Sequence, residues 1–329
     1  MGSMKRAEGP PTCARNQAPA RALALSVVCI ALLAACAGDS GQGGESAESV
    51  APEESATAEK LVHPSFSVTE EQIESHLASA AADLRPAFAE RFTPQILARP
   101  QYFLELLRRS FRQDPDFYRL VDKQHKLPSD YAPTDTVPLN RFRDRLVLNR
   151  NDLSVRAVIL PDLFAMIEAA RQEGITLDVS STYRSYDYQA GLFERHVSNL
   201  GREEAERVSA QPGSSQHQLG TTVDFGSISP AFADTAAGRW LAEHAGRFGF
   251  SLAYPNGYEA LTGYSYEPWH FRYISRIGTQ LEAEFFEGLQ QHFLEFYHSQ
   301  AAWFRNRMHS AADPRDGAGT TTSPPPESS

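Results

Sequence analysis

The stretch PGSSQHQLGTTVD at residues 212–224 decides how this chain folds and where its chemistry lies. It starts with turn-forming residues, passes through His217 and Gly220, and continues as a β-prone run to Asp224. His217 and Asp224 are seven residues apart, so one unbroken strand would turn them to opposite faces. Gly220 lies between them and permits a bend or bulge that brings both side chains to one side.

A second stretch, YEPWHF at residues 266–271, places Glu267 three residues before His270. Pro268 interrupts any regular strand there, so the two side chains can converge. Two histidines and Asp224 offer three N/O ligands, which is the number that a catalytic zinc site uses. The fourth position of such a site holds a water whose pKa is lowered to ~7. Glu267 is the candidate for moving protons beside it. The residue types alone fit such a site and a scatter of structural His and Asp equally well.

The elements around these stretches predict an α+β fold. Short β-prone runs alternate with helical patterns in no strict β-α-β order, which favours a small, mostly antiparallel sheet flanked by helices. We expect strands at 177–181, 221–225, 250–254 and 269–273, and helices at 160–173, 187–197 and 235–248.

Two further regions are helical in pattern. Thr69 and Gln72 form a capping box, which predicts a helix to about residue 89. Thr93-Pro94 predicts a second helix with proline in its first turn, and 100–111 a third. We therefore expect an N-terminal helical segment at 62–116. A C-terminal helix is predicted at about 280–307, within a segment 281–310.

The first 35 residues resemble an export signal. Basic residues precede a 13-residue apolar run at 23–35, well short of the ~20 that a spanning helix needs. The run ends in Leu33-Ala34-Ala35-Cys36, which resembles the lipobox of bacterial lipoproteins and implies a lipidated Cys36. The alternative is an ordinary cleaved signal with an incidental cysteine. The lipoprotein interpretation predicts an exported protein of the cell envelope, anchored to a membrane by lipid.

The segments next to both ends are polar. Residues 36–61 are rich in Gly, Ser, Ala and Glu, which predicts a disordered tether, and 311–329 predicts a disordered tail. The three cysteines, Cys13, Cys29 and Cys36, all lie near the N-terminus, so the body has no disulfide and no cysteine ligand. The net charge of −10, with no basic stripe, argues against a nucleic-acid partner.

Three motifs resemble the VanY-type D-alanyl-D-alanine carboxypeptidases, a zinc peptidase group related to VanX-type dipeptidases and to the Hedgehog fold. The pattern S-x-H-x-x-G-x-A-x-D is met by Ser215, His217, Gly220 and Asp224, and E-x-W-H by Glu267, Trp269 and His270. The pattern S-G-Y-R-S-x-x-x-Q corresponds to residues 181–185 with Gln189. Softer matches are Val121-Asp122-Lys123, Leu127-Pro128 and Tyr131, and then Thr262-Gly263-Tyr264.

The resemblance implies roles for particular residues of a zinc peptidase domain at 117–280. His217, Asp224 and His270 would bind Zn²⁺, and Glu267 would be the general base and acid. Arg184 would hold the substrate carboxylate, with Ser215 and Gln189 assisting. Two departures from the family pattern, Thr182 for Gly and Thr222 for Ala, add bulk that we expect near the pocket.

The implied function is removal of the terminal D-alanine from peptidoglycan stem peptides. Alternatives are an L,D-carboxypeptidase, a dipeptidase, a stem endopeptidase, or a non-catalytic peptidoglycan-binding lipoprotein. Glu267 argues against the last, because a binding protein needs no proton shuttle. The sequence predicts no particular oligomeric state.

Overall fold

The computed structural model describes residues 60–80 and 88–309, which belong to one compact unit, Thr57–Ser329. The predicted signal segment, Cys36, nearly all of the predicted tether and the predicted tail lie outside the described residues. Within 60–80 and 88–309, no helix combines the length and apolarity needed to cross a membrane. The segment boundaries proposed from the sequence stay predictions.

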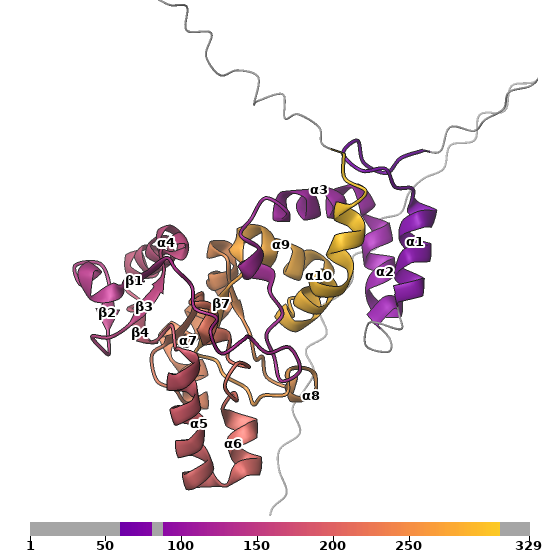
Figure 1. Ribbon diagram of the computed structural model, residues 1–329. Coiled ribbons are helices and arrows are strands. Elements are labelled where there is room, and N and C mark those ends of the chain that lie inside the picture. The colour runs from indigo at the N-terminus through magenta and orange to yellow at the C-terminus, as the bar shows by residue number, and fades with distance from the viewer. Residues whose placement is uncertain (1–59, 81–87, 310–329) are drawn as a thin grey trace, which may run out of the picture. The chain divides into compact units, whose positions relative to one another are not determined.

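A five-stranded sheet lies at the centre of the fold, in the order β2-β4-β5-β7-β6 (Figure 1). Strands β2 and β4 pair in parallel, and the other three pairs are antiparallel. Strands β1 and β3 form a separate antiparallel pair. The strands are β1 Thr136–Pro138, β2 Val147–Leu148, β3 Ser154–Arg156, β4 Asp178–Ser181, β5 Thr222–Phe225, β6 Phe250–Leu252 and β7 His270–Tyr273.

Helices surround this sheet, and the expected α+β class with a mostly antiparallel sheet is confirmed. Figure 1 shows α1, α2 and α3 on the same side as α9 and α10, and α3 contacts α9, which in turn contacts α10. The helices are α1 Glu70–Ser79, α2 Phe88–Ala98, α3 Pro100–Ser110, α4 Leu160–Gln172, α5 Tyr186–Leu200, α6 Arg202–Val208, α7 Ala236–His244, α8 Glu259–Thr262, α9 Ser275–Phe285 and α10 Gln290–Arg305.

The four strands expected from the sequence are present as β4, β5, β6 and β7. The capping box is present at the start of α1, where Thr69 and Gln72 exchange hydrogen bonds. Strands β1, β2 and β3 were not predicted, because they are only two or three residues long and carry too little alternation to be recognised.

The prediction that Pro94 lies in the first turn of a helix is wrong. Helix α2 begins at Phe88 and carries Pro94 in its interior. Proline removes one backbone hydrogen bond there. The apolar face continues across it, with Phe88, Phe92 and Ile96 all buried. Burial of this face sustains the helix through the proline, because each buried side chain contributes about 1.5–3 kcal/mol.

The prediction of one continuous helix from 280 to 307 is also wrong. Helix α9 ends at Phe285, and α10 begins at Gln290. Glu287 and Gly288 adopt left-handed φ angles of 57° and 68°. The Gly288 N–H donates to the carbonyl of Glu282 at 3.0 Å, which closes the end of α9.

The N-terminal helices share one hydrophobic core with the sheet and with α9 and α10. Phe103 of α3 packs its ring against those of Phe285, Phe296 and Phe304 at centroid distances of 5.1, 5.7 and 5.7 Å. The two ends of the described chain also meet. Phe66 forms an antiparallel bridge with Met308, and the N–H groups on either side of the bridge donate across it at 2.8 Å.

Arg272 of β7 is a fully buried cation in this core. Its Nη2 donates to the carbonyl oxygens of Asp116, Phe117 and Arg119, at 3.2, 3.2 and 2.7 Å. Burial lowers the pKa of Arg272 to about 10, so it stays charged at neutral pH. The strand is thereby fastened to the segment that leads into residues 121–131.

Glu282 of α9 is a second buried ionisable residue, 6% exposed. It accepts a 2.8 Å hydrogen bond from the hydroxyl of Ser251. Burial raises the pKa of Glu282 to about 8. Between about pH 4.5 and pH 8, Glu282 is therefore protonated in the folded protein but ionised in the unfolded chain. Stability falls as the pH rises from about 4.5 to about 8.

We expect Glu282→Gln to raise the melting temperature at pH 8, because the amide carries no charge to bury. The free energy of unfolding should rise by about 2–4 kcal/mol at pH 8 and change little at pH 5. Thermal unfolding at both pH values measures it. Glu243→Gln, at an exposed position of α7, is the control and should change little at either pH. An equal gain at pH 5 and pH 8 would contradict the buried-proton explanation.

Candidate functional site

His217 lies on a short 3-10 turn, Gln216–Leu219, which ends at Gly220. Gly220 adopts a left-handed φ of 71° and turns the chain into β5. A Cβ at this position would lie 2.9 Å from Cγ of Arg156, so glycine is required by both conformation and space. The bend expected at Gly220 is confirmed, and it brings His217 to the side of the sheet that carries Asp224.

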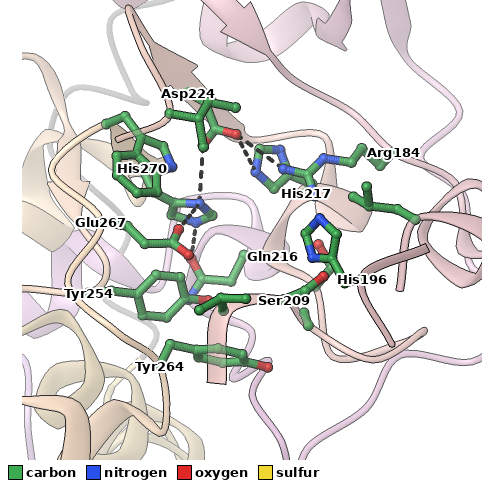
Figure 2. A pocket seen from close by; sticks show the side chains of 16 residues that line it. Arg184, His196, Ser209, Gln216, His217, Asp224, Tyr254, Tyr264, Glu267 and His270 are labelled. Carbon is green, nitrogen blue, oxygen red and sulfur yellow. Dashed lines mark hydrogen bonds and ion pairs between the residues drawn. The ribbon is translucent and has the colours of Figure 1, made fainter. Parts of the chain in front are cut away.

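The pairing of β5 with β7 places Asp224 directly opposite His270. Nε2 of His217 lies 3.1 Å from Oδ2 of Asp224, and Nδ1 of His270 lies 3.1 Å from Oδ1 (Figure 2). The two imidazole rings stand nearly perpendicular, with centroids 4.9 Å apart. All three residues are buried, and one candidate ligand atom from each lies within 4.8 Å of the others. The structure thus brings together the three ligands predicted from the sequence.

Hydrogen bonding assigns the tautomer of His217. Its Nδ1 lies 2.7 Å from the carbonyl oxygen of Thr182, which can only accept, so Nδ1 carries the proton. Burial, followed by the positive charge of Arg184, lowers the pKa of His217 to about 4. The ring is therefore neutral at neutral pH, and Nε2 turns a lone pair toward Asp224.

Gln216 assigns the tautomer of His270 in the same way. Its Nε2 donates to Oε1 of Gln290 at 3.1 Å, so its own Oε1 faces Nε2 of His270, at 3.4 Å. Nε2 of His270 therefore carries the proton, and Nδ1 turns a lone pair toward Asp224. Gln290 is the first residue of α10, so the C-terminal helices help to orient this ring.

Two lone pairs thus face one carboxylate, and neither imidazole offers that carboxylate a donor. Among the described residues, Nε2 of His217 and Oδ1 of Asp224 have no hydrogen-bond partner. Buried acceptors that face one another are unfavourable unless a cation lies between them. Two imidazole nitrogens and one carboxylate oxygen are the donor set of a catalytic zinc site. The site therefore fits the metal that the sequence predicted.

Glu267 stands beside this cluster. Its Oε2 lies 3.3 Å from Nδ1 of His270, and the side chain remains 14% exposed. The backbone N–H of Glu267 donates to the carbonyl of Tyr254 at 3.1 Å, which fixes the residue just before β7. Burial, followed by the negative charge of Asp224, raises the pKa of Glu267 to about 8. The expected convergence of Glu267 and His270 is confirmed.

Arg184 approaches the cluster from the loop between β4 and α5. Its Nε, Nη1 and Nη2 donate to Ser181 Oγ, Gln189 Oε1 and Asp224 Oδ2, at 3.1, 3.0 and 3.1 Å. One N–H on each terminal nitrogen is left for a ligand. Gln189 is fully buried, and its Nε2 donates to the carbonyl of Ala210. Both polar groups of Gln189 are thus engaged, and it lies behind Arg184 as a support.

These residues surround a cavity of about 180 Å³. Ser215 lines it, as expected, whereas Thr182 and Thr222 are buried outside it and do not add bulk to its walls. Trp269 is 8% exposed, belongs to the core and reaches the cavity wall. The lining residues are Arg184, Leu192, His196, Val208, Ser209, Ala210, Ser215, Gln216, His217, Asp224, Ile228, Tyr254, Tyr264, Glu267, Trp269 and His270.

His196 is a cavity residue that no sequence motif marks. It lines the cavity with Arg184 and His217, and Figure 2 labels its ring among theirs. Burial, followed by the charge of Arg184, lowers the pKa of His196. Its spacing from Gln189 and Leu192 is helical, which puts all three on one face of α5. That spacing was the available signal. Tyr254 also lacked any motif that pointed to the site. Its ring centroid lies 4.8 Å from that of Tyr264, which belongs to the softer family match at 262–264.

Comparison with known proteins gives this region a context. Residues 152–276 match the family model described as VanY, D-alanyl-D-alanine carboxypeptidase. The chain is 37% identical over 172 residues to the putative carboxypeptidase YodJ of Bacillus subtilis (strain 168), covering 50% of this chain and 62% of that protein. It is 33% identical over 164 residues to a D-alanyl-D-alanine carboxypeptidase of Enterococcus faecalis (strain ATCC 700802 / V583), covering 47% and 57%. The chain thus spans about three fifths of these relatives.

Solved structures resemble more than half of the chain. The LdcB LD-carboxypeptidase is 32% identical, covers 57% of this chain and 88% of its own, and has a TM-score of 0.49. VanYB in complex with D-alanine-D-alanine is 30% identical, covers 56% of this chain and 97% of its own, and has a TM-score of 0.45.

The geometry predicts about one zinc ion per chain, held by His217, Asp224 and His270. Replacing any of the three with alanine should lower the metal content of purified protein, measured by elemental analysis. His298→Ala, at an exposed position of α10, is the control and should keep full occupancy. Full zinc occupancy in all three ligand variants would refute the ligand assignment.

Proposed function

Because residues 152–276 match the family model of the VanY D-alanyl-D-alanine carboxypeptidases, we propose that this chain is a zinc-dependent carboxypeptidase that removes the terminal D-alanine from peptidoglycan stem peptides. One observation carries the proposal: three ligands for a metal, an unligated carboxyl group and a guanidinium converge on one cavity. The match to a D-alanyl-D-alanine carboxypeptidase of E. faecalis supports the choice of substrate.

The metal site would be built from His217, Asp224 and His270. Bound there, Zn²⁺ supplies a Lewis acid and lowers the pKa of water toward 7. The protein's own contribution is to hold the imidazoles in the right tautomers. Thr182 does this for His217 and Gln216 for His270. Such supporting hydrogen bonds are commonly worth 10- to 100-fold in metal affinity.

Glu267 would move the proton. Its carboxylate takes a proton from the attacking water and returns it to the nitrogen of the leaving D-alanine. The position suits this role, since Oε2 lies beside His270 and the side chain opens to the cavity. Burial in a polar cleft beside Asp224 also favours a carboxyl group that can both release and accept a proton near neutral pH.

Arg184 would bind the free carboxylate at the end of the peptide. A guanidinium meets a planar carboxylate through two parallel hydrogen bonds. Ser181 and Gln189 hold the guanidinium in place, so little order is lost when the substrate binds. The hydroxyl of Ser215 on the cavity wall is available as a further donor. A carboxylate recognised in this way selects the last residue of a chain.

A dipeptidase is the second candidate, favoured by one comparison. The chain is 29% identical to a bifunctional D-Ala-D-Ala dipeptidase and D-Ala-D-Ala carboxypeptidase of Enterococcus gallinarum, over 94% of that protein. Three alternatives from the sequence remain: an L,D-carboxypeptidase, a stem endopeptidase and a non-catalytic binding protein. Each would use the same cavity, and the two enzymes would use the same candidate metal ligands. The products formed from defined peptides separate all of these activities.

Incubation with stem pentapeptide, tetrapeptide and D-alanyl-D-alanine, followed by mass analysis, tests the function. We expect loss of one alanine from the pentapeptide and little reaction of the other two. Glu267→Gln should keep its zinc and its melting temperature but lose about 10²–10⁴ in turnover. It should still bind intact pentapeptide. A Glu267→Gln protein that cleaves at near wild-type rate would remove the proposed mechanism.

The location of the protein is a separate proposal. We infer from Leu33-Ala34-Ala35-Cys36 that the mature chain is an exported lipoprotein whose first residue is Cys36. The membrane would then be a partner through two or more acyl chains, because one chain gives only marginal binding. An anchor of this kind would keep the peptidase close to the cell wall.

Expression of the full chain in bacteria tests the anchor. The protein should partition into detergent, and mass spectrometry of the mature N-terminus should find acylated Cys36. Cys36→Ser should remain unacylated and stay out of the detergent phase. An unmodified Cys36, or cleavage at another position, would show that the lipoprotein interpretation is wrong.

A further inference from the structure

A second cavity adjoins the one that holds the candidate metal site. Ser209 and Tyr264 line both, so the two cavities have part of their walls in common. The second cavity has a volume of about 50 Å³. One water needs ~10–15 Å³ by the same measure, so this space holds a group the size of a carboxylate. It is lined by Lys123, Glu206, Ser209, Gln211, Ser214 and Tyr264.

Lys123 belongs to the motif at 121–131, to which the proposed mechanism gives no role. The loop is fixed to the turn that carries His217. The N–H of Leu127 donates to the carbonyl of Gly213 at 2.8 Å. Gln218, next to His217, donates to the carbonyls of Pro128 and Tyr131 at 3.0 and 3.1 Å. The position of Lys123 is therefore tied to that of the metal site.

The ammonium group of Lys123 has no carboxylate partner within ion-pair distance in the part of the chain that the structure describes. It lies 4.8 Å from the ring centroid of Tyr264, and its stem passes close to Gly263. The nearby acids are engaged elsewhere. Asp122 accepts hydrogen bonds from the 124–125 turn and from Gln291. Glu206 accepts from Gln211 and pairs with Arg202.

Two hydroxyl groups add to this excess of donors. Ser214 is 1% exposed and Tyr264 is 3% exposed. Neither hydroxyl oxygen has a hydrogen-bond partner among residues 60–80 and 88–309. A buried hydroxyl without a partner is unfavourable, so a ligand that brings acceptors into this cavity gains from all three groups. An ammonium and two hydroxyls select an anion with two acceptor oxygens.

We propose that the second cavity is a subsite for a carboxylate that the stem peptide carries upstream of the cleaved bond, with Lys123 as its main charge partner. This inference rests on the proposed function, because the adjoining cavity would hold the peptide's C-terminal end. Two parts of a stem peptide offer such a group: the α-carboxylate of a γ-linked glutamate, and the side-chain carboxylate of a diaminopimelate residue. The chemistry at Lys123 is the same for both.

Three pentapeptides and two variants test the subsite. The peptides carry both upstream carboxylates, an amide in place of the glutamate carboxylate, or an amide in place of the diaminopimelate carboxylate. Lys123→Met keeps the apolar stem against Tyr264 and removes the charge. Lys60→Met removes the same charge at an exposed position that lines neither cavity.

For the wild type and Lys60→Met, we expect one of the two amidations to lower kcat/KM about twofold to fivefold, the effect of an exposed charge pair. That peptide identifies which carboxylate is bound. Lys123→Met should be lower by a similar factor on the fully charged peptide and indifferent to the same amidation. The loss should appear mainly in KM.

Two results would overturn the subsite. One is a wild type indifferent to both amidations, and the other is a Lys123→Met protein that loses the same factor on all three peptides. If the wild type cleaves none of them, the proposed function fails, and the subsite is then judged by calorimetric affinities for the same peptides. Equal affinities of wild type and Lys123→Met for the charged peptide would reject it.

Discussion

The pairing of β5 with β7 is the constraint on which the site depends. It sets Asp224 opposite His270 and, one position earlier on β5, Val223 opposite Phe271. Successive side chains of a strand point to opposite faces, so polar groups occupy one face and apolar groups the other. A slip of one residue would bury the carboxylate in the apolar layer and place Val223 beside the imidazoles. The packing of Val223 and Phe271 in the core therefore also fixes the ligands.

The same face of β7 positions the surrounding loops. Arg272 lies two residues beyond His270, and its buried guanidinium holds the carbonyls at 116, 117 and 119. The chain runs from there into the loop that carries Lys123. The turn with His217 fastens the far end of that loop through Gln218. Both cavities thus take their walls from segments fixed to the two central strands.

The parts of this arrangement that the sequence predicted share a local signal. Gly220 marked the bend after His217, Pro268 marked the break between Glu267 and His270, and the four longer β-prone runs marked their strands. The three ligands were named because their residue types matched a known pattern. The imidazole lone pairs face Asp224 because Thr182 and Gln216 accept hydrogen bonds from the opposite ring nitrogens. No spacing in the sequence reveals these hydrogen bonds.

What the sequence did not predict depends on contacts between distant segments. Gln189 was expected near substrate, but the path of the chain near Ala210 gives its amide a buried partner behind Arg184. The break between α9 and α10 depends on left-handed residues at 287 and 288, and Glu287 carries no local signal for that conformation. The run at 121–131 resembles the family in its residue pattern, which does not say where the loop lies. Its place beside the site depends on hydrogen bonds from Gln218, about 90 residues away in the sequence.

The bridge between Phe66 and Met308 has a consequence for how the chain acquires its structure. It joins segments separated by about 240 residues, and contacts of such long range form late because a long loop must close first. During synthesis α1, α2 and α3 emerge well before α9 and α10, so the contacts of α2 and α3 with α9 cannot form until the last helices exist. A chain exported as we propose would gain from this delay, because part of its core would still be unformed while its N-terminus is already being threaded across the membrane.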